Sequence, residues 1–384
     1  VAAIGLVADL TAAAAKQAAL NAGARVGTVL AGNLGEAELD RLQAARPEIV
    51  LFAGGTDGGQ RDRVLANARR LAERGLDGYV VVACNAEIGE EVATILGEAG
   101  IEAEVAANVM PALGRLEIEG AREAISGAFL EHVIGGKGLS ASPEFARMVK
   151  MPTPEAALDA TRLLAEGTAG RGGVGDVIVI DVGGATTDVH SSRGLEPAAP
   201  GIEAPLLPVP LTLRTVEGDL GLRAGAPGAV AADRRWLAEG SEGGEDLDTA
   251  AAARSGRPAW IPEGEVEARL DHLLAVGCAT HAVDRHCGTM LLSRGKGGPP
   301  TLVRDGPDLR EVGRMIGTGG VFANREDGEA ILAETVSRRA PRSLAPHGPR
   351  LVVDGGYVLA AAGLLASLDP GAALALLETE LIQA

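Results

Sequence analysis

The stretch DVIVIDVGGATTDVHS, residues 176–191, has the pattern of a buried strand, a tight turn and a second extended segment. An apolar run of strand length ends at Asp181. Gly183 and Gly184 then turn the chain, and an extended run resumes at Asp188. Tight glycine turns let backbone N–H groups approach an anion, and the threonine hydroxyls of this turn add donors. Carboxylates beside phosphates usually hold Mg²⁺ through water, so the stretch predicts a grip for Mg-triphosphate. The alternative is a plain β-hairpin, which rarely needs two aspartates and two threonines around its turn.

The chain before this stretch alternates short apolar runs with amphipathic segments of helix length. Strands separated by helices predict a βαβ arrangement with a mostly parallel sheet. The expected strands lie at 25–30, 49–53 and 78–83, and the expected helices lie at 11–22, 35–45, 60–74 and 119–150, the last with a glycine-rich break at 135–138.

The regions nearer the carboxyl end predict further helices and strands around the same core. A helix is expected after Pro152, because Pro154 and Glu155 suit the first turn of a helix. The other expected elements are a mostly helical region at 228–275, a strand in PTLVRDG (300–306), a helix at 308–315, a strand in RLVVDGG (350–356) and the apolar helix 357–368.

The composition fits a globular protein of two or three domains. The 384 residues are 46% hydrophobic and only 2% aromatic, so the core must consist mainly of Ala, Val, Leu and Ile. Acidic residues outnumber basic ones 52 to 35, which gives a net charge of −17. This charge repels phosphate backbones and anionic lipids, so neither nucleic acid nor a membrane surface is an expected partner.

The three cysteines predict a reducing compartment, here the cytoplasm. They are odd in number and lack CxxC spacing, which excludes a disulfide framework at this size. The longest uncharged stretch has the length of a buried helix, too short to span a bilayer, and no signal-peptide pattern opens the chain. A metal site is a weak alternative for Cys278, His281, His286 and Cys287, and packing is the stronger interpretation.

Several segments resemble the actin-like ATPase superfamily, which includes sugar kinases and the seventy-kilodalton heat-shock proteins. The turn D-x-G-G-[GA]-T-x-D is similar to the second phosphate loop of that superfamily. Four further segments occur in the matching order: MPTPEAALDATRLLAEG (151–167) like the first crossing helix, VEGDLGLR (216–223) like the turn after the phosphate loop, IGTGGVF (316–322) like the adenosine loop, and DGGYVLAAAG (354–363) like the second crossing helix.

The resemblance narrows to one branch and covers essentially the whole chain. Five segments resemble the MutL/GlmL accessory proteins of methylaspartate (glutamate) mutase. They are FAGGTDGG (52–59), AANVMPALGRLEIEGAREAI (106–125), RTVEGDLGLR (214–223), the RHCGT turn (285–289) and MIGTGGVF (315–322). This implies a two-lobe α/β fold of the actin-like, ribonuclease H-like type, with mixed sheets flanked by helices. Residues 1–150 would be the remainder of the first lobe, and residues 151–384 the second lobe.

The resemblance also implies a function, a set of cofactors and a partner. The expected function is that of a chaperone-like factor that uses ATP and Mg²⁺ to reactivate an adenosylcobalamin-dependent mutase, whose subunits are its partners. Closure of the lobes around Mg-ATP and reopening on hydrolysis would alter the grip on the mutase.

The candidate site residues follow from the matched motifs. Asp181 would orient Mg²⁺ or the attacking water, and Asp188 would assist a water on the metal. The residues expected to hold the nucleotide are Gly183, Gly184, Thr186 and Thr187 at the phosphates, Gly218 and Asp219 in the following turn, and Gly317, Gly319 and Gly320 at the nucleoside.

One departure from the superfamily pattern leaves other functions open. The first phosphate loop, D-x-G-[ST]-[ST] on a hairpin, does not occur in residues 1–60, so weak nucleotide binding and negligible hydrolysis are expected of residues 1–384. A small-molecule kinase on the same fold is one alternative, with Asp57 as its candidate catalytic carboxylate. A non-catalytic binding module of the mutase system is the other.

Overall fold

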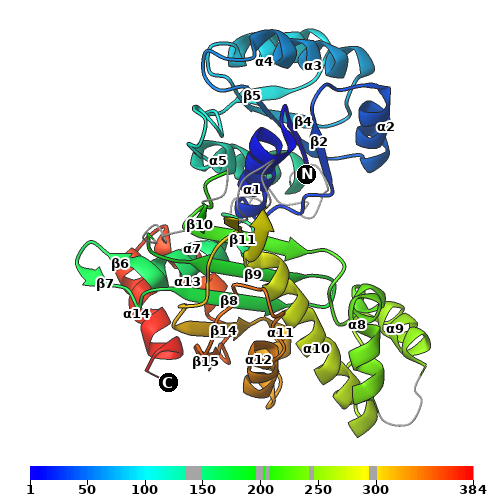
Figure 1. Ribbon diagram of the computed structural model, residues 1–384, viewed down its shortest axis with the longest axis vertical. Helices are drawn as coiled ribbons and strands as arrows, with labels where there is room; N and C mark the ends of the chain where they lie inside the picture. Colours follow the sequence, from blue (N-terminus) through cyan, green and yellow to red (C-terminus); the bar gives the residue numbers. More distant parts are fainter. Residues whose placement is uncertain (135–148, 196–201, 204–206, 242–245, 294–300, 384) are drawn as a thin grey trace. The chain divides into compact units, whose positions relative to one another are not determined.

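A computed structural model describes residues 1–134, 149–195, 202–203, 207–241, 246–293 and 301–383 (Figure 1). The chain divides into two compact units. Unit 1 comprises residues 1–155 and 206–210, and unit 2 comprises residues 156–205 and 211–384.

Unit 1 is built on a five-stranded sheet that is parallel throughout. Its strands are β1 (Ala2–Gly5), β2 (Thr28–Ala31), β3 (Ile49–Gly54), β4 (Tyr79–Cys84) and β5 (Ala103–Val105), in the order β2-β1-β3-β4-β5. All four neighbouring pairs are parallel, which confirms the predicted βαβ arrangement. The central strands read as continuous apolar runs because both faces of the sheet are covered.

Helices cover both faces of this sheet. They are α1 (Ala13–Asn21), α2 (Glu36–Ala45), α3 (Arg61–Arg74), α4 (Gly89–Glu98) and α5 (Glu119–Ala128), with π-helical turns at Ala8–Ala12 and Phe129–Ile134. α2, α3 and α4 share one hydrophobic core with the sheet, and α1 and α5 share the other. This strand order is that of flavodoxin-like doubly wound sheets.

Unit 2 is built on a mixed five-stranded sheet. Its strands are β8 (Val177–Val182), β9 (Thr187–Ser192), β11 (Thr212–Glu217), β14 (Arg314–Thr318) and β15 (Arg350–Val353), in the order β11-β9-β8-β14-β15. β8, β9 and β11 form an antiparallel ribbon, and β14 and β15 continue it in parallel with β8. Smaller sheets are formed by β10 (Ile202–Glu203), β12 (Thr289–Ser293) and β13 (Thr301–Asp305), and by β6 (Gly167–Thr168) and β7 (Arg171–Gly172).

Helices also cover both faces of the sheet in unit 2. They are α7 (Thr153–Glu166), α8 (Ala226–Gly240), α9 (Leu247–Ser255), α10 (Glu265–His286), α11 (Gly320–Ala323), α12 (Gly328–Ser337), α13 (Leu359–Ala366) and α14 (Pro370–Leu381). α7, α13 and α14 pack with Val177 and Val179 on one face of β8. α8, α10 and α12 pack with Ile178 and Ile180 on the other. Figure 1 shows α8 and α9 beside the long helix α10.

Three features of the sequence were interpreted incorrectly or missed. Residues 308–315 do not form a helix: the N–H of Val312 closes a turn onto the carbonyl of Leu309 (3.1 Å), and from Arg314 onward the chain pairs in parallel with β8 and β15 as strand β14. Strand β1 lies in an alanine-rich opening with little strand propensity, and it forms because β2 and β3 pair with it. Helix α14 was not predicted. The expected break at 135–138 lies outside the described residues.

No helix in the described part of the chain is long and apolar enough to cross a membrane.

Candidate nucleotide site in unit 2

The glycine turn predicted as a phosphate loop joins β8 to β9. The backbone N–H of Gly183 donates to the carbonyl of Thr186 (2.9 Å), which closes the turn. Asp181 and Asp188 lie directly opposite each other in the antiparallel register. Because cross-strand partners share a face of a sheet, the two carboxylates are neighbours on one face.

Asp188 is neutralised by a buried arginine. Its Oδ1 accepts hydrogen bonds from Nε (2.8 Å) and Nη2 (2.5 Å) of Arg214 on β11. Arg214 is 2% exposed, and burial lowers its pKa while Asp188 opposes that shift. A buried pair of this kind holds both side chains in place, since breaking it would leave an uncompensated charge. Arg214 was not among the predicted site residues.

Asp181 has a different environment from its neighbour. No donor among the described residues hydrogen-bonds to its carboxylate. Burial, with the nearby carboxylates of Asp188 and Asp354, raises the pKa of Asp181 to about 7. Next to it lies Gly319, whose φ is +92° and where an added Cβ would come 2.1 Å from Oδ1 of Asp181. A glycine is therefore required at this point of the adenosine-loop motif.

Asp354 fastens the end of the neighbouring strand. Its carboxylate accepts hydrogen bonds from the hydroxyl of Thr318 (2.8 Å) and from the N–H groups of Val358 (2.9 Å) and Leu359 (3.1 Å). Asp354 thus ties the end of β14 to the start of α13 and has its acceptors occupied.

The turn after β11 packs directly against the phosphate loop. The N–H groups of Leu222 and Arg223 donate to the carbonyls of Gly183 (3.1 Å) and Gly184 (2.7 Å). An added Cβ at Gly221 would lie 2.7 Å from the carbonyl oxygen of Gly184, so only glycine permits this approach. The Gly-Asp-x-x-Leu-Gly resemblance marks this contact between two backbones.

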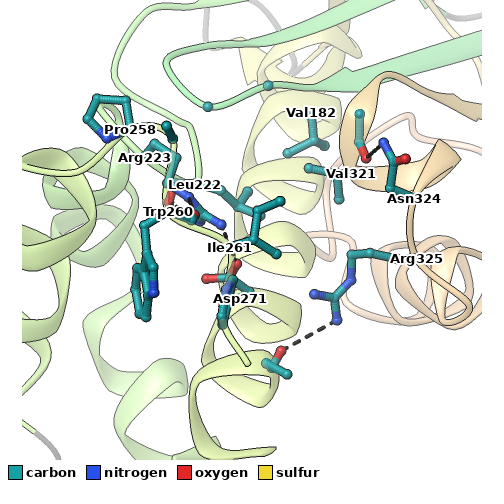
Figure 2. Close-up of a pocket in the computed structure, with 16 residues that line it drawn as sticks. Val182, Leu222, Arg223, Pro258, Trp260, Ile261, Asp271, Val321, Asn324 and Arg325 are labelled. Atoms are coloured by element: carbon teal, nitrogen blue, oxygen red, sulfur yellow. Dashed lines mark hydrogen bonds and ion pairs between the residues drawn. The ribbon is translucent and has the colours of Figure 1, made fainter. Parts of the chain in front are cut away.

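A cavity of about 710 Å³ opens beside these loops (Figure 2). Figure 2 shows Trp260 on one side of it and Val321 and Asn324 on the other. The lining residues come from the phosphate loop, the turn after β11, the α9–α10 connection, α10 and the start of α11: Val182, Gly183, Gly184, Leu222, Arg223, Pro258, Ala259, Trp260, Ile261, Pro262, Ala268, Asp271, Gly320, Val321, Asn324 and Arg325. One wall is therefore apolar and the rest carries a few polar groups, as is typical of small-molecule sites.

The structure places the predicted residues at different distances from this cavity. Gly183, Gly184 and Gly320 line it. Thr186 stands in the turn, with its hydroxyl 3.4 Å from Oδ2 of Asp188. The other members of the predicted set do not line it. Thr187 donates to the carbonyl of Leu220 (2.9 Å), Asp219 pairs with Arg285, Gly218 lies in the turn before Asp219, and Gly317 packs under the ring of Phe322. Asp181 and Asp188, on the strands that flank the turn, and Gly319, beside Asp181, are not among the lining residues either; Asp181 directly precedes Val182 and Gly183, which are.

Sequence reasoning missed most of the side chains that shape the cavity. Trp260 and Ile261 stand in a loop whose only sequence signal is its flanking prolines, Pro258 and Pro262. Asp271 lies within a long helix and carries no motif.

The cysteine and histidine residues near the end of α10 have separate partners. His281 faces Asp233 (3.3 Å), whereas His286 lies between Thr215 (2.9 Å) and Ser191 (2.8 Å). Burial lowers the pKa of His286 to about 3, so it is neutral. Within the described ranges no group of three or more His, Cys, Asp or Glu residues is arranged to hold a metal ion.

Comparison with known proteins agrees with the narrower of the two resemblances. A family model described as "MutL protein" matches residues 1–381. The chain is 38% identical over 392 residues to "Protein MutL" of Clostridium tetanomorphum, covering 99% of this chain and 83% of that protein. The predicted family is thereby confirmed: the chain belongs to the MutL protein family.

Proposed function

We propose that unit 2 binds ATP with Mg²⁺ in the 710 Å³ cavity, and that the chain is an actin-like accessory factor that reactivates an adenosylcobalamin-dependent glutamate (methylaspartate) mutase. The observation that carries the nucleotide part is the meeting of three loops distant in sequence. The phosphate loop, the turn at 221–223 and the loop at 319–320 surround one cavity or touch each other's backbones. Independent turns have no reason to meet in this way.

The sheet of unit 2 supports the actin-like part of the proposal. The resemblance implies mixed sheets flanked by helices, and the sheet β11-β9-β8-β14-β15, an antiparallel ribbon continued by two parallel strands with helices on both faces, is compatible with it. The link to the mutase comes from the MutL family.

The geometry assigns different tasks to the residues of the phosphate loop. The N–H of Gly183 is used to close the turn, so phosphate oxygens would be held by the N–H groups that follow, from Gly184 onward. Asp181 would hold Mg²⁺ through water, because no donor in the described ranges bonds to its carboxylate, whereas Asp188 and Asp354 both have protein donors. The metal, when bound, neutralises phosphate charge. Asp188 and Thr187, both engaged with protein partners, would keep the loop in shape.

The kinase alternative receives no support from its candidate base. Oδ1 of Asp57 accepts hydrogen bonds from the N–H of Ala86 (2.9 Å) and from Nδ2 of Asn108 (2.8 Å), so the carboxylate fastens loops within unit 1.

Titration with ATP and Mg²⁺, followed by calorimetry and by phosphate release, tests the nucleotide part. We expect saturable binding that Asp181→Asn weakens by about tenfold or more, since a charge-assisted contact to the hydrated metal is lost. Asp219→Asn is the matched control: this carboxylate stands in the neighbouring turn and is already paired with Arg285, whereas no donor among the described residues bonds to Asp181. Absence of binding, or equal effects of the two substitutions, would contradict the assignment.

Recovery of an inactivated mutase tests the second part. A mutase carrying damaged cobalamin is incubated with this chain, ATP and fresh adenosylcobalamin, and its activity is followed. Recovery that needs both the chain and ATP is expected. Nucleotide binding without any recovery would favour a non-catalytic binding module.

A further inference from the structure

Arg223 connects the phosphate loop, at Gly184, to the apolar wall of the cavity, the loop that carries Trp260 and Ile261. Its backbone N–H donates to the carbonyl of Gly184 (2.7 Å), so its position follows the phosphate loop. Its side chain lines the cavity, where Nε donates to the carbonyl of Trp260 (2.9 Å) and Nη2 to Oδ2 of Asp271 (2.8 Å) (Figure 2). One side chain therefore contacts the two elements that form the opposite side of the site.

The wall that Arg223 contacts is a loop with few other anchors of its own. The N–H of Trp260 donates to the carbonyl of Arg257 (2.9 Å), and the indole ring lies near the guanidinium groups of Arg254 (5.3 Å) and Arg257 (4.6 Å). Ile261 beside it is 77% exposed and borders the cavity. An exposed isoleucine can offer a flat apolar surface to a ligand only if its backbone is held.

Asp271 holds Arg223 in place by linking it to a second buried arginine, Arg254. Its Oδ1 accepts from Nε of Arg254 (2.8 Å) while Oδ2 accepts from Arg223, and both Asp271 and Arg254 are buried. Arg254 in turn pairs with Glu267 (2.7 Å). Removing one member would leave a buried charge without its partner, so the network holds all of its members in one geometry.

We propose that Arg223 is a positioning residue: it fixes the position of the apolar wall of the cavity, the loop with Trp260 and Ile261, relative to the phosphate loop. The inference rests on the proposed nucleotide site and assigns Arg223 to the nucleoside half of the ligand. The guanidinium bonds three protein oxygens, those of Trp260, Leu222 and Asp271, so it holds the wall and does not bind phosphate. Lysine cannot substitute for it, because a single ammonium lacks the planar fork of donors.

Separate fragments of the nucleotide test this assignment in the full chain. Trp236→Phe leaves Trp260 as the single tryptophan, and its fluorescence then reports on the wall. In this background, adenosine, Mg-pyrophosphate and Mg-ADP are titrated against Arg223 and against Arg223→Met. We expect the substitution to weaken adenosine by about tenfold, as for a lost ordered apolar contact, and to leave the dissociation constant of pyrophosphate within about twofold.

Two further variants complete the design. Arg223→Lys keeps a positive charge beside Asp271 but loses the bond to Trp260, so it should fold and should still bind adenosine poorly. Arg338→Met is the matched control in the same Trp236→Phe background, because Arg338 pairs with the carboxylate of Asp233 (2.6 Å) away from the cavity. This substitution should leave the affinity for adenosine, for Mg-pyrophosphate and for Mg-ADP unchanged.

The outcomes separate the two proposals. Equal weakening of adenosine and pyrophosphate would make Arg223 a phosphate ligand and overturn its positioning role, as would unchanged adenosine binding in Arg223→Met. If the chain with Arg223 intact binds none of the three fragments, the nucleotide site itself is refuted and the inference with it.

Discussion

Two glycine loops with nearly the same letters stand at the carboxyl ends of buried strands, one in each unit. GGTD at 54–57 follows β3, and GGATTD at 183–188 follows β8. In unit 1, the loop aspartate is bonded by two donors, Ala86 N–H and Asn108 Nδ2. In unit 2, the aspartate of the loop itself, Asp188, is paired with Arg214, but Asp181 on the strand before the loop receives no hydrogen bond from the described residues, and its pKa is raised to about 7.

The difference arises from the strands beside each loop. In the parallel sheet of unit 1, the loops after β4 and β5 emerge at the same edge as GGTD. They supply Asn85, which bonds Gly58 (3.1 Å) and Gly59 (2.9 Å), and Asn108, which bonds Gly55 (3.1 Å). In unit 2, the chain turns back as a hairpin, and the loop borders a cavity. A glycine loop is available to bind a ligand where its neighbours leave polar groups without partners, which is why the nucleotide site is proposed in unit 2. Where the neighbours satisfy those groups, as in unit 1, the loop has a structural role.

The largest expected effect comes from breaking the ion pair between Asp188 and Arg214 at the glycine loop of unit 2. Arg214→Met should lower the free energy of unfolding of unit 2 by about 3–5 kcal/mol, because Asp188 stays buried without its counter-charge. Urea unfolding followed by tryptophan fluorescence measures it, since Trp236 and Trp260 both belong to unit 2. Arg235→Met, at an exposed pair with Glu239, is the control and should change stability little. A loss below about 1 kcal/mol for Arg214→Met would show that the pair is not needed to hold the loop.

The next effect concerns Asp181, whose carboxylate accepts no hydrogen bond from the described residues. Because the folded-state pKa of Asp181 is raised, to about 7, the folded protein holds this proton more tightly than the unfolded chain does. Its contribution to stability is therefore greatest at low pH and is lost as the pH rises from about 4 to about 7. Asp181→Asn should be about 2–4 kcal/mol more stable than the parent near pH 8 and equal to it near pH 4.

Denaturant unfolding at several pH values checks this sign. The companion variant Asp57→Asn sharpens the comparison, because it removes a charged acceptor from two donors and should lower stability. If both substitutions stabilised the protein near pH 8, the two loops would not differ in the way their contacts indicate.

The smallest effect is expected at the glycine loop of unit 1, residues 54–57. Asn108→Ala removes the two bonds that Nδ2 donates and the one that Oδ1 accepts from Met110 N–H (3.0 Å), at a site 4% exposed. We expect unit 1 to lose about 1–3 kcal/mol. Circular dichroism follows this loss while tryptophan fluorescence tracks unit 2. Asn33→Ala, at an exposed side chain bonded to Arg63, is the control. An unchanged unfolding midpoint for Asn108→Ala would mean that water replaces the amide and that the loop is not closed by it.

Much of the architecture followed from local patterns. The apolar runs predicted the strands β3, β4 and β8, and the spacing of helices between the runs in the first part of the chain predicted a parallel sheet in unit 1. Local patterns failed where neighbouring strands override propensity, as in the alanine-rich β1 and at Arg314 and Met315, which pair with β8 and β15 in place of the expected helix.

By itself, the sequence determined the family, the glycine loops and the pairing of Asp181 with Asp188, because a tight turn between two strands sets which residues face each other. Only the tertiary structure decided that Asp188 is neutralised by Arg214 and that Arg223 holds the wall of the cavity. These partners are 26 and 37 residues distant along the chain, counting from Asp188 to Arg214 and from Arg223 to Trp260. No local pattern encodes such contacts, since strand register and helix packing bring them together and burial then determines the charge that each carboxylate carries.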